Sequence, residues 1–382
     1  MAPQHPTAAL FLCEFVMEIL SWIPAKPVTR LKLVCKSWNS IISHPHFVKL
    51  HLHRSPKNAI LLVTRTPPLP EKERKQGLVL SSVESFIQNP SSTLDAQENR
   101  HVLHLQDWVL GSCNGLVCVA HILFHPNNHN CDILFRLWNP LIGFISGNSP
   151  SPCLRVNGHD AFGFGYDESS DSYKVVTASR NSSGTVTAQV YSFHGNSWKR
   201  VNSFPAFPFS ADDNGHFIGG TLNWLGLRNP HGDHYDWAAV TLDMLMIVSL
   251  DLKSDTNKQI LLPKGIDEMP REEPTLGVWG NSLYLLHDYK NTHFIAWQMK
   301  EFGDENSWTQ LLKISFHYLD VETLWLPEFI FENGNIFMFM GRHRFVEVFY
   351  DRRDNSVKRV NISANNCYMD AFDYVESLVQ PC

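Results

Sequence analysis

The sequence predicts a mainly β protein with a small α-helical head, and it predicts that the β part is a propeller of about six blades. The first observation is a change of apolar period. Over about the first 55 residues apolar side chains recur every three to four positions, whereas from residue 58 they form short runs typical of strands. The second observation is an internal repeat of about 50 residues, for which the remaining part of the chain has room six times.

The helical head is predicted from apolar stripes that prolines interrupt. One stripe has the i, i+3, i+4, i+7 spacing of a helix face and consists of Val16, Ile19, Leu20 and Ile23. Pro24 ends this helix, and Pro27 suits the first turn of a second one. The apolar positions of that second helix are Val28, Leu31, Val34, Cys35, Trp38, Ile41 and Ile42. A third helix is expected after Pro45, and since three short helices bury little surface, the head needs a partner or the β domain for stability.

Net charge and cysteine content narrow the class of protein. The net charge is −6, yet the first 60 residues hold seven Lys and Arg against two Glu. A basic head on an acidic body argues against nucleic-acid binding and suits a head that docks on an acidic partner. The eight cysteines form no C-x-x-C pair, no signal peptide precedes them, and no apolar run reaches the roughly 18 residues of a membrane helix. We therefore expect free thiols and a location in the cytoplasm, the nucleus or both.

Two landmarks define the repeat. A turn followed by a short strand, as in NSWKRV, NSWTQL and NSVKRV, begins at Asn196, Asn306 and Asn355, and SDTNKQI fits the same place. Glycines before apolar strands recur at Gly115, Gly165, Gly220, Gly280 and Gly334. Three to four short strands per 50 residues is the size of a kelch-type propeller blade. Trp198 and Trp308 share one repeat position, where we expect them to pack between blades.

Motifs that would indicate chemistry are weak. The G-x-G in GFGYD from Gly163 lacks a third glycine and a following helix, so it predicts a β-turn rather than a dinucleotide site. HPNNH from His125 and HGDH from His231 lack further metal ligands and predict surface loops. Cys113 and Cys118 lack an adjacent base and predict small buried positions. We expect no catalytic residues, no metal and no cofactor.

The stretch VMEILSWIPAKPVTRLKLVCKSWNSIISHPHFVKLHL resembles the F-box of plant F-box proteins, and the resemblance spans Phe11 to about Leu52. It implies docking on a Skp-type adaptor, which links F-boxes to a cullin–RING ubiquitin ligase. The residues that match adaptor-facing and core positions of the family are Phe11, Leu12, Val16, Ile19, Leu20, Ile23, Pro24, Leu31, Val34, Cys35 and Trp38. The family usually has Leu-Pro where this chain has Phe11-Leu12. Because proline would preset the first turn of the helix, its absence predicts weaker adaptor binding.

The rest of the chain resembles the F-box-associated, kelch-like domain of the same plant family. The resemblance lies in GSCNGLVCVA, LWNP, FGFGYDESSDSYKVV, VYSFHGNSWKRV, GTLNWL, IVSLDL and SWTQL. It implies an F-box over residues 10–55 and the propeller over residues 58–380. In this family the head is thought to hold the adaptor and the body the target. The chain is thus expected to be a non-catalytic substrate-recognition subunit of a Skp–cullin–F-box E3 ubiquitin ligase, with an unknown target protein and neither nucleic acid nor membrane as partner.

Two alternatives remain open on the sequence. The first is an F-box-derived interaction protein that is no longer coupled to the ligase, which the missing proline at Leu12 encourages. The second is a propeller that acts as an enzyme or binds glycans. An enzyme needs convergent titratable groups, of which the sequence offers no clear set. A glycan site needs exposed tryptophans on loops, for which Trp237 and Trp279 are the candidates.

Overall fold

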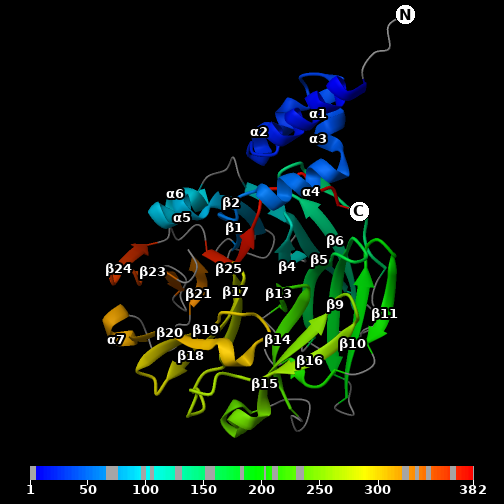
Figure 1. Ribbon diagram of the computed structural model, residues 1–382. Coiled ribbons are helices and arrows are strands. Elements are labelled where there is room, and N and C mark those ends of the chain that lie inside the picture. The colour runs from blue at the N-terminus through cyan, green and yellow to red at the C-terminus, as the bar shows by residue number, and fades with distance from the viewer. Residues whose placement is uncertain are drawn as a thin grey trace, which may run out of the picture.

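The structure is a computed structural model that describes residues 6–65, 76–95, 100–103, 107–124, 131–150, 160–180, 185–201, 204–208, 214–228, 236–320, 327–331, 335–340, 346–361 and 367–381. Within these ranges a group of N-terminal helices stands on one end of a six-bladed β-propeller (Figure 1). The predicted fold class, mainly β with a helical head and six blades, is confirmed.

The head consists of α1 (Pro6–Leu20), α2 (Ala25–Leu31), α3 (Lys36–Ser43) and α4 (Pro45–Arg54). The prediction of three helices is wrong in one place, because the stretch after Pro27 forms two helices joined by a turn. The backbone is extended at Cys35, with φ −162° and ψ 166°, and this interrupts the helix. Pro45 stands in the first turn of α4, where a missing N–H leaves no hydrogen bond unmade.

The position of Leu12 also differs from the prediction. Because α1 begins at Pro6, Leu12 is the seventh residue of the helix rather than part of its first turn. A proline there would remove an interior hydrogen bond and clash with the preceding turn, which costs about 3 kcal/mol or more. The missing proline is therefore no reason to expect weaker docking.

Each blade is an antiparallel sheet whose innermost strand lies toward the propeller axis. Blade 1 consists of β25 (Cys367–Tyr374), β1 (Ala59–Arg65), β2 (Gln76–Ser82) and β3 (Arg100–Leu103). Blade 2 consists of β4 (Asp107–Cys113), β5 (Leu116–Phe124), β6 (Cys131–Asn139) and β7 (Phe144–Ile145). Blade 3 consists of β8 (Ala161–Asp167), β9 (Ser172–Arg180), β10 (Val186–Ser192) and β11 (Ser197–Val201).

The other three blades follow the same plan. In blade 4, β12 (Phe207–Pro208) and β13 (His216–Ile218) both pair with β14 (Thr221–Leu227), which is followed by β15 (Leu245–Asp251) and β16 (Thr256–Ile260). Blade 5 consists of β17 (Thr275–Trp279), β18 (Ser282–Tyr289), β19 (His293–Met299) and β20 (Trp308–Ser315). Blade 6 consists of β21 (Pro327–Phe331), β22 (Ile336–Met340), β23 (Val346–Asp351) and β24 (Ser356–Asn361).

Short helices lie between some strands. They are α5 (Val83–Gln88), α6 (Pro90–Asp95), α7 (Phe316–Leu319), η3 (Trp237–Ala239), η4 (Leu242–Met244) and η5 (Glu305–Ser307). Of these, α5 and α6 follow β2 and lie against β2 of blade 1 and β24 of blade 6 (Figure 1).

Blade 1 closes the ring with strands from both ends of the propeller. β25 pairs with β1, so that Tyr374 lies opposite Ala59 and Phe372 lies opposite Leu61. The C-terminal strand thereby becomes the innermost strand of a blade whose other three strands come directly after the head. This shared blade joins the two ends of the propeller and so closes the ring.

Apolar side chains between neighbouring blades form the core. Phe135 of blade 2 packs on Phe162 of blade 3, with ring centroids 6.2 Å apart, and further clusters join blades 3 and 4 and blades 4 and 5. A separate cluster fills the head. The propeller is thus stabilised by burial between blades, as the alternation within the strands predicts.

The predicted repeat corresponds to the outermost strands. Its four turn segments lead into β11, β16, β20 and β24 of blades 3 to 6. Trp198 in β11 donates its indole N–H to the carbonyl of Pro150 at 3.0 Å, and Trp308 in β20 donates to Leu261 at 3.1 Å. Each acceptor follows the outermost strand of the preceding blade. The prediction that these tryptophans pack between blades at one repeat position is confirmed.

The glycine landmark holds at three described positions and fails at one. The turns after the innermost strands contain Gly115, Gly220 and Gly280, with φ of 77°, 77° and 63°. Gly165 instead lies inside β8, where a Cβ would come within 2.4 Å of the Phe217 ring. Gly165 is therefore required by the close approach of blade 4, and Gly334 lies outside the described residues.

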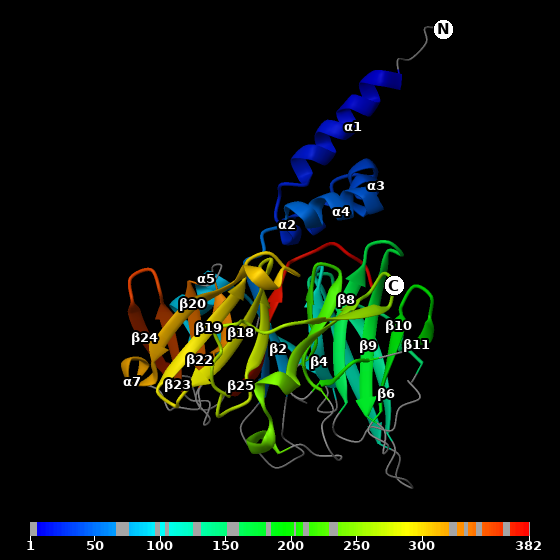
Figure 2. The same cartoon turned by 60° about the horizontal axis from the view of Figure 1, so that its bottom comes forward.

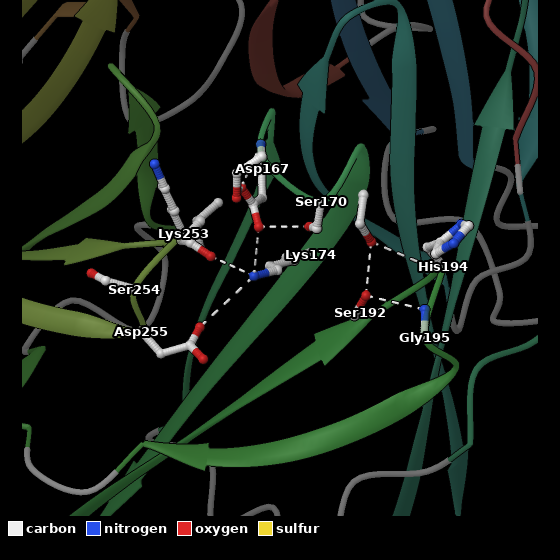
Figure 3. A network of polar contacts seen from close by, with 12 residues as sticks. Asp167, Ser170, Lys174, Ser192, His194, Gly195, Lys253, Ser254 and Asp255 are labelled. Atoms are coloured by element: carbon white, nitrogen blue, oxygen red, sulfur yellow. Dashed lines mark hydrogen bonds and ion pairs between the residues drawn. The ribbon is translucent and has the colours of Figure 1, made fainter.

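A buried ion network ties blade 3 to blade 4 (Figure 3). Lys174 in β9 lies 3.0 Å from Asp167 and 3.8 Å from Asp255, and it donates to the carbonyl of Leu252. Burial opposes ionisation of Asp167, but the Ser170 hydroxyl and other hydrogen bonds, including one from Lys174, lower the pKa of its carboxyl. The charged residues of YDESSDSYKVV thus supply a contact between blades.

Candidate functional site

Five large apolar side chains of the head are exposed. They are Phe15, Ile19, Trp22, Leu33 and Val34, and the exposed fraction reaches 66% for Trp22 and 88% for Leu33. The described part of the propeller is several times larger, yet it exposes only six such side chains. A concentration of exposed apolar side chains marks a protein interaction site. We call these five residues the docking surface.

Local contacts hold the α1 side of the docking surface in place. Phe15 and Ile19 lie one helical turn apart on α1, and Trp22 is the second residue after the helix. The guanidinium of Arg54 lies 4.6 Å from the centroid of the Trp22 ring, and the Trp22 indole N–H donates to Glu18 at 3.3 Å. Arg54 also pairs with Glu18 at 2.9 Å, and this contact lowers the pKa of the Glu18 carboxyl. The exposed indole is therefore preorganised rather than free.

The remaining two residues, Leu33 and Val34, lie in the turn between α2 and α3. The N–H of Leu33 donates to Arg30 at 3.1 Å, and the N–H of Val34 donates to Leu31 at 3.1 Å. These i to i−3 bonds tighten the end of α2, as is common where a helix stops. Both side chains of this turn are left exposed.

The structure divides the eleven predicted adaptor-binding residues into three groups. The exposed residues are Ile19, Pro24, Val34 and Cys35. The residues that belong to the core of the head or pack against it are Leu20, which is buried, and Val16, Ile23, Leu31 and Trp38, which are half-buried. The side chains of Phe11 and Leu12 lie outside those that the structure describes.

Sequence reasoning missed Phe15, Trp22 and Leu33 as members of the surface. Phe15 and Ile19 form a stripe that is offset by one residue from Val16 and Leu20, so the helix is apolar on two adjacent faces. One face packs in the head and the other is exposed. Two adjacent apolar stripes are the signal that a surface helix contacts two partners.

The head is fixed internally by a buried histidine of α4. The Nε2 of His51 donates to the carbonyl of Ile23 at 2.8 Å, and its Nδ1 accepts from the Ser55 hydroxyl at 3.2 Å. Burial lowers the pKa of His51, which agrees with a neutral ring that uses one nitrogen as donor and the other as acceptor. His51 thereby holds the turn after α1 against α4.

The C-terminal tail, residues 375–381, joins the head to the propeller. Leu378 is 2% exposed and belongs to the core of the head. Asn139, the asparagine of LWNP, donates its amide N–H groups to the carbonyls of Ser377 at 2.9 Å and Val379 at 2.8 Å. Figure 2 shows this C-terminal segment running between the propeller and the helices of the head. The tail is thus held by blade 2 on one side and by the head on the other.

Two further contacts fix the head over blades 2 and 3. Leu141, which follows β6, packs against the core of the head. Lys49 of α4 pairs with Asp171 in the turn between β8 and β9 at 2.9 Å, although both side chains are exposed. An exposed pair of this kind contributes little stability, so the apolar contacts of Leu141 and Leu378 dominate.

The motifs that could have carried chemistry have structural roles where the structure describes them. The GFGYD motif from Gly163 lies in strand β8, so the predicted β-turn is wrong, and Gly163 packs against Trp224. Cys113 and Cys118 are buried as predicted, and burial raises the pKa of both thiols, that of Cys113 to about 12. Both histidine motifs, at residues 125–129 and 231–234, lie outside the described residues.

The two tryptophans considered for glycan binding are not exposed rings on loops. Trp279 is 8% exposed in β17 and packs on Tyr284, with ring centroids 5.3 Å apart. Trp237 is half-buried and donates its indole N–H to the carbonyl of Pro270 at 3.1 Å. Among the described residues no group of three or more His, Cys, Asp or Glu is placed to hold a metal ion. The described helices include none that is both long and apolar enough to span a membrane.

A preorganised apolar surface on a helical head, fixed to a closed propeller, defines a two-part protein-interaction molecule. Comparison with protein-family models identifies it further. Residues 13–50 match the F-box domain, and residues 75–381 match the F-box associated beta propeller domain. The chain belongs to the family of F-box proteins with an F-box associated β-propeller domain.

Individual relatives agree with this assignment. The F-box/kelch-repeat protein At3g23880 of Arabidopsis thaliana is 30% identical over 82% of this chain and 82% of its own length. The F-box protein CPR1 of the same plant is 24% identical over 79% of this chain and 72% of its own. Among solved structures, TolB from Acinetobacter baumannii aligns with 88% of this chain and 72% of its own, at 11% identity and a TM-score of 0.47, too low to carry an argument.

The family defines the general role of the chain. An F-box domain implies binding to a Skp-type adaptor, and F-box proteins are generally non-catalytic adaptor subunits. The expected kelch-like character is not confirmed, because the matched body is an F-box associated propeller and only the name of one relative refers to kelch repeats.

Proposed function

We propose that this protein is a non-catalytic substrate-recognition subunit of a Skp–cullin–F-box E3 ubiquitin ligase. Residues 10–55 dock on the Skp-type adaptor and through it on the cullin, and residues 58–380 bind the target protein. The subunit works in the cytoplasm, the nucleus or both. Its contribution is proximity, because a bound target is held at a high effective concentration near the ubiquitin-carrying enzyme.

The observation that carries this proposal is the docking surface on a head that is fixed to the propeller. Exposed apolar side chains need a partner, and the F-box match names the class of that partner. We propose that Ile19 and Val34, together with Phe15, Trp22 and Leu33, contact the adaptor, with Pro24 and Cys35 beside them. The predicted residues Leu20, Val16, Ile23, Leu31 and Trp38 act indirectly, by keeping the head folded.

The experiment is a titration of the full chain with a purified Skp-type adaptor. Ile19→Glu should weaken binding by about tenfold or more, because it places a charge at the centre of an apolar contact. Since Ile19 is exposed, the melting temperature should change little. Phe144→Glu in β7 makes the same kind of change at an exposed position of the propeller and should leave adaptor binding unchanged.

Each other result has a definite meaning. Equal affinities for Ile19→Glu and the unchanged protein would contradict the docking surface. Failure of the unchanged protein to bind any Skp-type adaptor would favour the alternative of an F-box-derived protein without a ligase. The half-buried and buried positions of Trp237 and Trp279 give no support to the glycan-binding alternative.

A further inference from the structure

A cavity of about 1630 Å³ lies on the propeller axis at the end that carries the head. Its wall is formed by turns that follow innermost strands and by Lys57 and Asn58, which join α4 to β1. The volume exceeds the roughly 300–1,000 Å³ of small-molecule pockets. The cavity therefore has room for a peptide segment.

Among the described residues of the wall, the charged side chains are mainly acidic. One of the five acids, Asp167, is balanced by Lys174. The remaining charged residues are Glu84, Glu168, Asp251 and Asp373 against Lys57 and Lys253. This excess of negative charge attracts a basic segment and repels a phosphorylated one.

Asp373 is the acid best placed to contact a segment on the axis. It lies in β25, the innermost strand of blade 1, between Phe372 and Tyr374, which pack into the core shared with blade 2. Asp373 points to the other side of the strand, into the cavity, where its side chain is accessible. The backbone N–H of Gly280 donates to its carboxylate, and Lys57 lies near it.

The groups around the Asp373 carboxyl do not fully stabilise its ionised form. The enclosing protein raises the pKa of Asp373 to about 7 despite the opposing effects of Gly280 and Lys57. A Lys or Arg side chain beside it would stabilise the ionised form.

We propose that this cavity binds the target, and that it takes an extended basic segment whose Lys or Arg side chain pairs with Asp373. The inference rests on the proposed function, since it specifies where and by which chemistry the propeller binds its target. The target then lies on the same end of the propeller as the docking surface. Because the tail fixes the head to the propeller, target and adaptor are held at a defined separation.

The test uses the full chain and two fluorescein-labelled dodecapeptides of Gly and Ser, one with four arginines and one with four glutamates. Fluorescence anisotropy at low salt should show binding of the arginine peptide and none of the glutamate peptide. Asp373→Asn should weaken binding of the arginine peptide by about tenfold, since it removes a charge and keeps an acceptor for Gly280.

A matched control separates this site from general attraction to an acidic protein. Asp243→Asn in η4 removes the same charge at an exposed position outside the cavity and should leave the affinity unchanged. Glu168→Gln, at an exposed position of the cavity wall, should weaken binding if Asp373→Asn does not fold. Equal weakening by the cavity and control variants would overturn the proposal, as would tighter binding of the glutamate peptide or no binding of either.

Adaptor binding is measured on the same proteins. If the arginine peptide binds through Asp373 but no Skp-type adaptor binds, the cavity assignment stands and the ligase assignment fails. If the adaptor binds and Asp373→Asn has no effect on peptide binding, the cavity assignment fails and the ligase assignment stands.

Discussion

The polar side chains in the most recognisable motifs connect parts of the fold. Asn139 of LWNP holds the C-terminal tail through two backbone carbonyls. Lys174 of YDESSDSYKVV bridges Asp167 in blade 3 and the 251–255 turn of blade 4. Both residues are buried and hydrogen-bonded, as polar groups in a protein interior must be. Contacts between blades explain why position 174 is a lysine, and contacts between propeller and tail explain why position 139 is an asparagine.

Lys174→Met should destabilise the propeller by about 3–5 kcal/mol, because it leaves the buried Asp167 carboxylate without its ion-pair partner. Urea denaturation of the full chain measures the loss. Lys290→Met is the matched control, since Lys290 and Glu268 form an exposed pair that contributes little. A loss of stability no greater than that of the control would show that the network in Figure 3 is not important for the fold.

Buried neutral histidines should make stability depend on pH. His287 in β18 donates from Nδ1 to the carbonyl of Asp288 at 2.8 Å and accepts the Trp297 indole N–H on Nε2 at 3.1 Å. Burial lowers the pKa of His287, and burial also lowers that of His216 to about 4. Below the unfolded pKa of about 6.5 the unfolded chain takes up protons that the folded chain refuses, so stability falls as pH falls.

The measurement is the free energy of unfolding in urea at pH 7.5 and pH 5.5. Each such histidine should contribute a loss of at most about 1.4 kcal/mol between pH 6.5 and 5.5. His287→Gln keeps an acceptor for Trp297 but does not titrate, so it should reduce the difference between the two pH values. His317→Gln in α7, at an exposed position, is the control. A pH difference that survives His287→Gln unchanged would contradict this account.

Whole elements were predictable where a local pattern decides them. The outermost strands β11, β20 and β24 each follow a polar turn whose last residue is Asn or Ser, and β11 and β20 begin at or near a tryptophan that packs on the preceding blade. The turn residues Asn196 and Asn355 adopt φ of 44° and 58°, a conformation that asparagine tolerates. Turn chemistry and burial thus point to the same places, which is why the repeat was visible without a structure.

Elements that depend on distant contacts were not predictable in the same way. The sequence between α2 and α3 contains no proline or glycine that would indicate a break. The helix is interrupted there by the extended backbone of Cys35. Gly165 looked like a turn residue, but its role depends on Phe217 of the next blade. The docking surface was predicted only in part, since an apolar stripe alone does not tell which side faces the core and which faces a partner.

At the scale of the whole molecule, the head and the propeller share one element. The tail belongs to the propeller by sequence, since it follows β25, yet Leu378 lies in the core of the head. Blade 2 presents the tail through Asn139 and contributes Leu141 to the same core. The domain boundary at residues 55–58 therefore separates two parts that depend on each other for packing, although the backbone connects them only at that boundary.

Leu378→Ala should loosen the head without unfolding the propeller. The change removes a buried side chain from the small core that includes Leu20 and Phe47, and such changes destabilise by about 2–5 kcal/mol. A core of that size has little stability to lose. Hydrogen exchange of the full chain should therefore show faster exchange in α1 to α4, whereas the strands of blades 3 to 5 keep their protection.

Gln380→Ala changes an exposed position of the same tail and should leave exchange in the head unchanged. Residues 1–57 expressed alone lack both Leu378 and Leu141, so they should show less helix than the same residues in the full chain. Addition of a Skp-type adaptor should restore helix, and the affinity should then be lower because part of the binding free energy is used to fold the head. A fully helical isolated head would show that the tail contact is dispensable. Loss of protection throughout the propeller in Leu378→Ala would show instead that the tail stabilises ring closure next to β25, and that the head is secondary to that role.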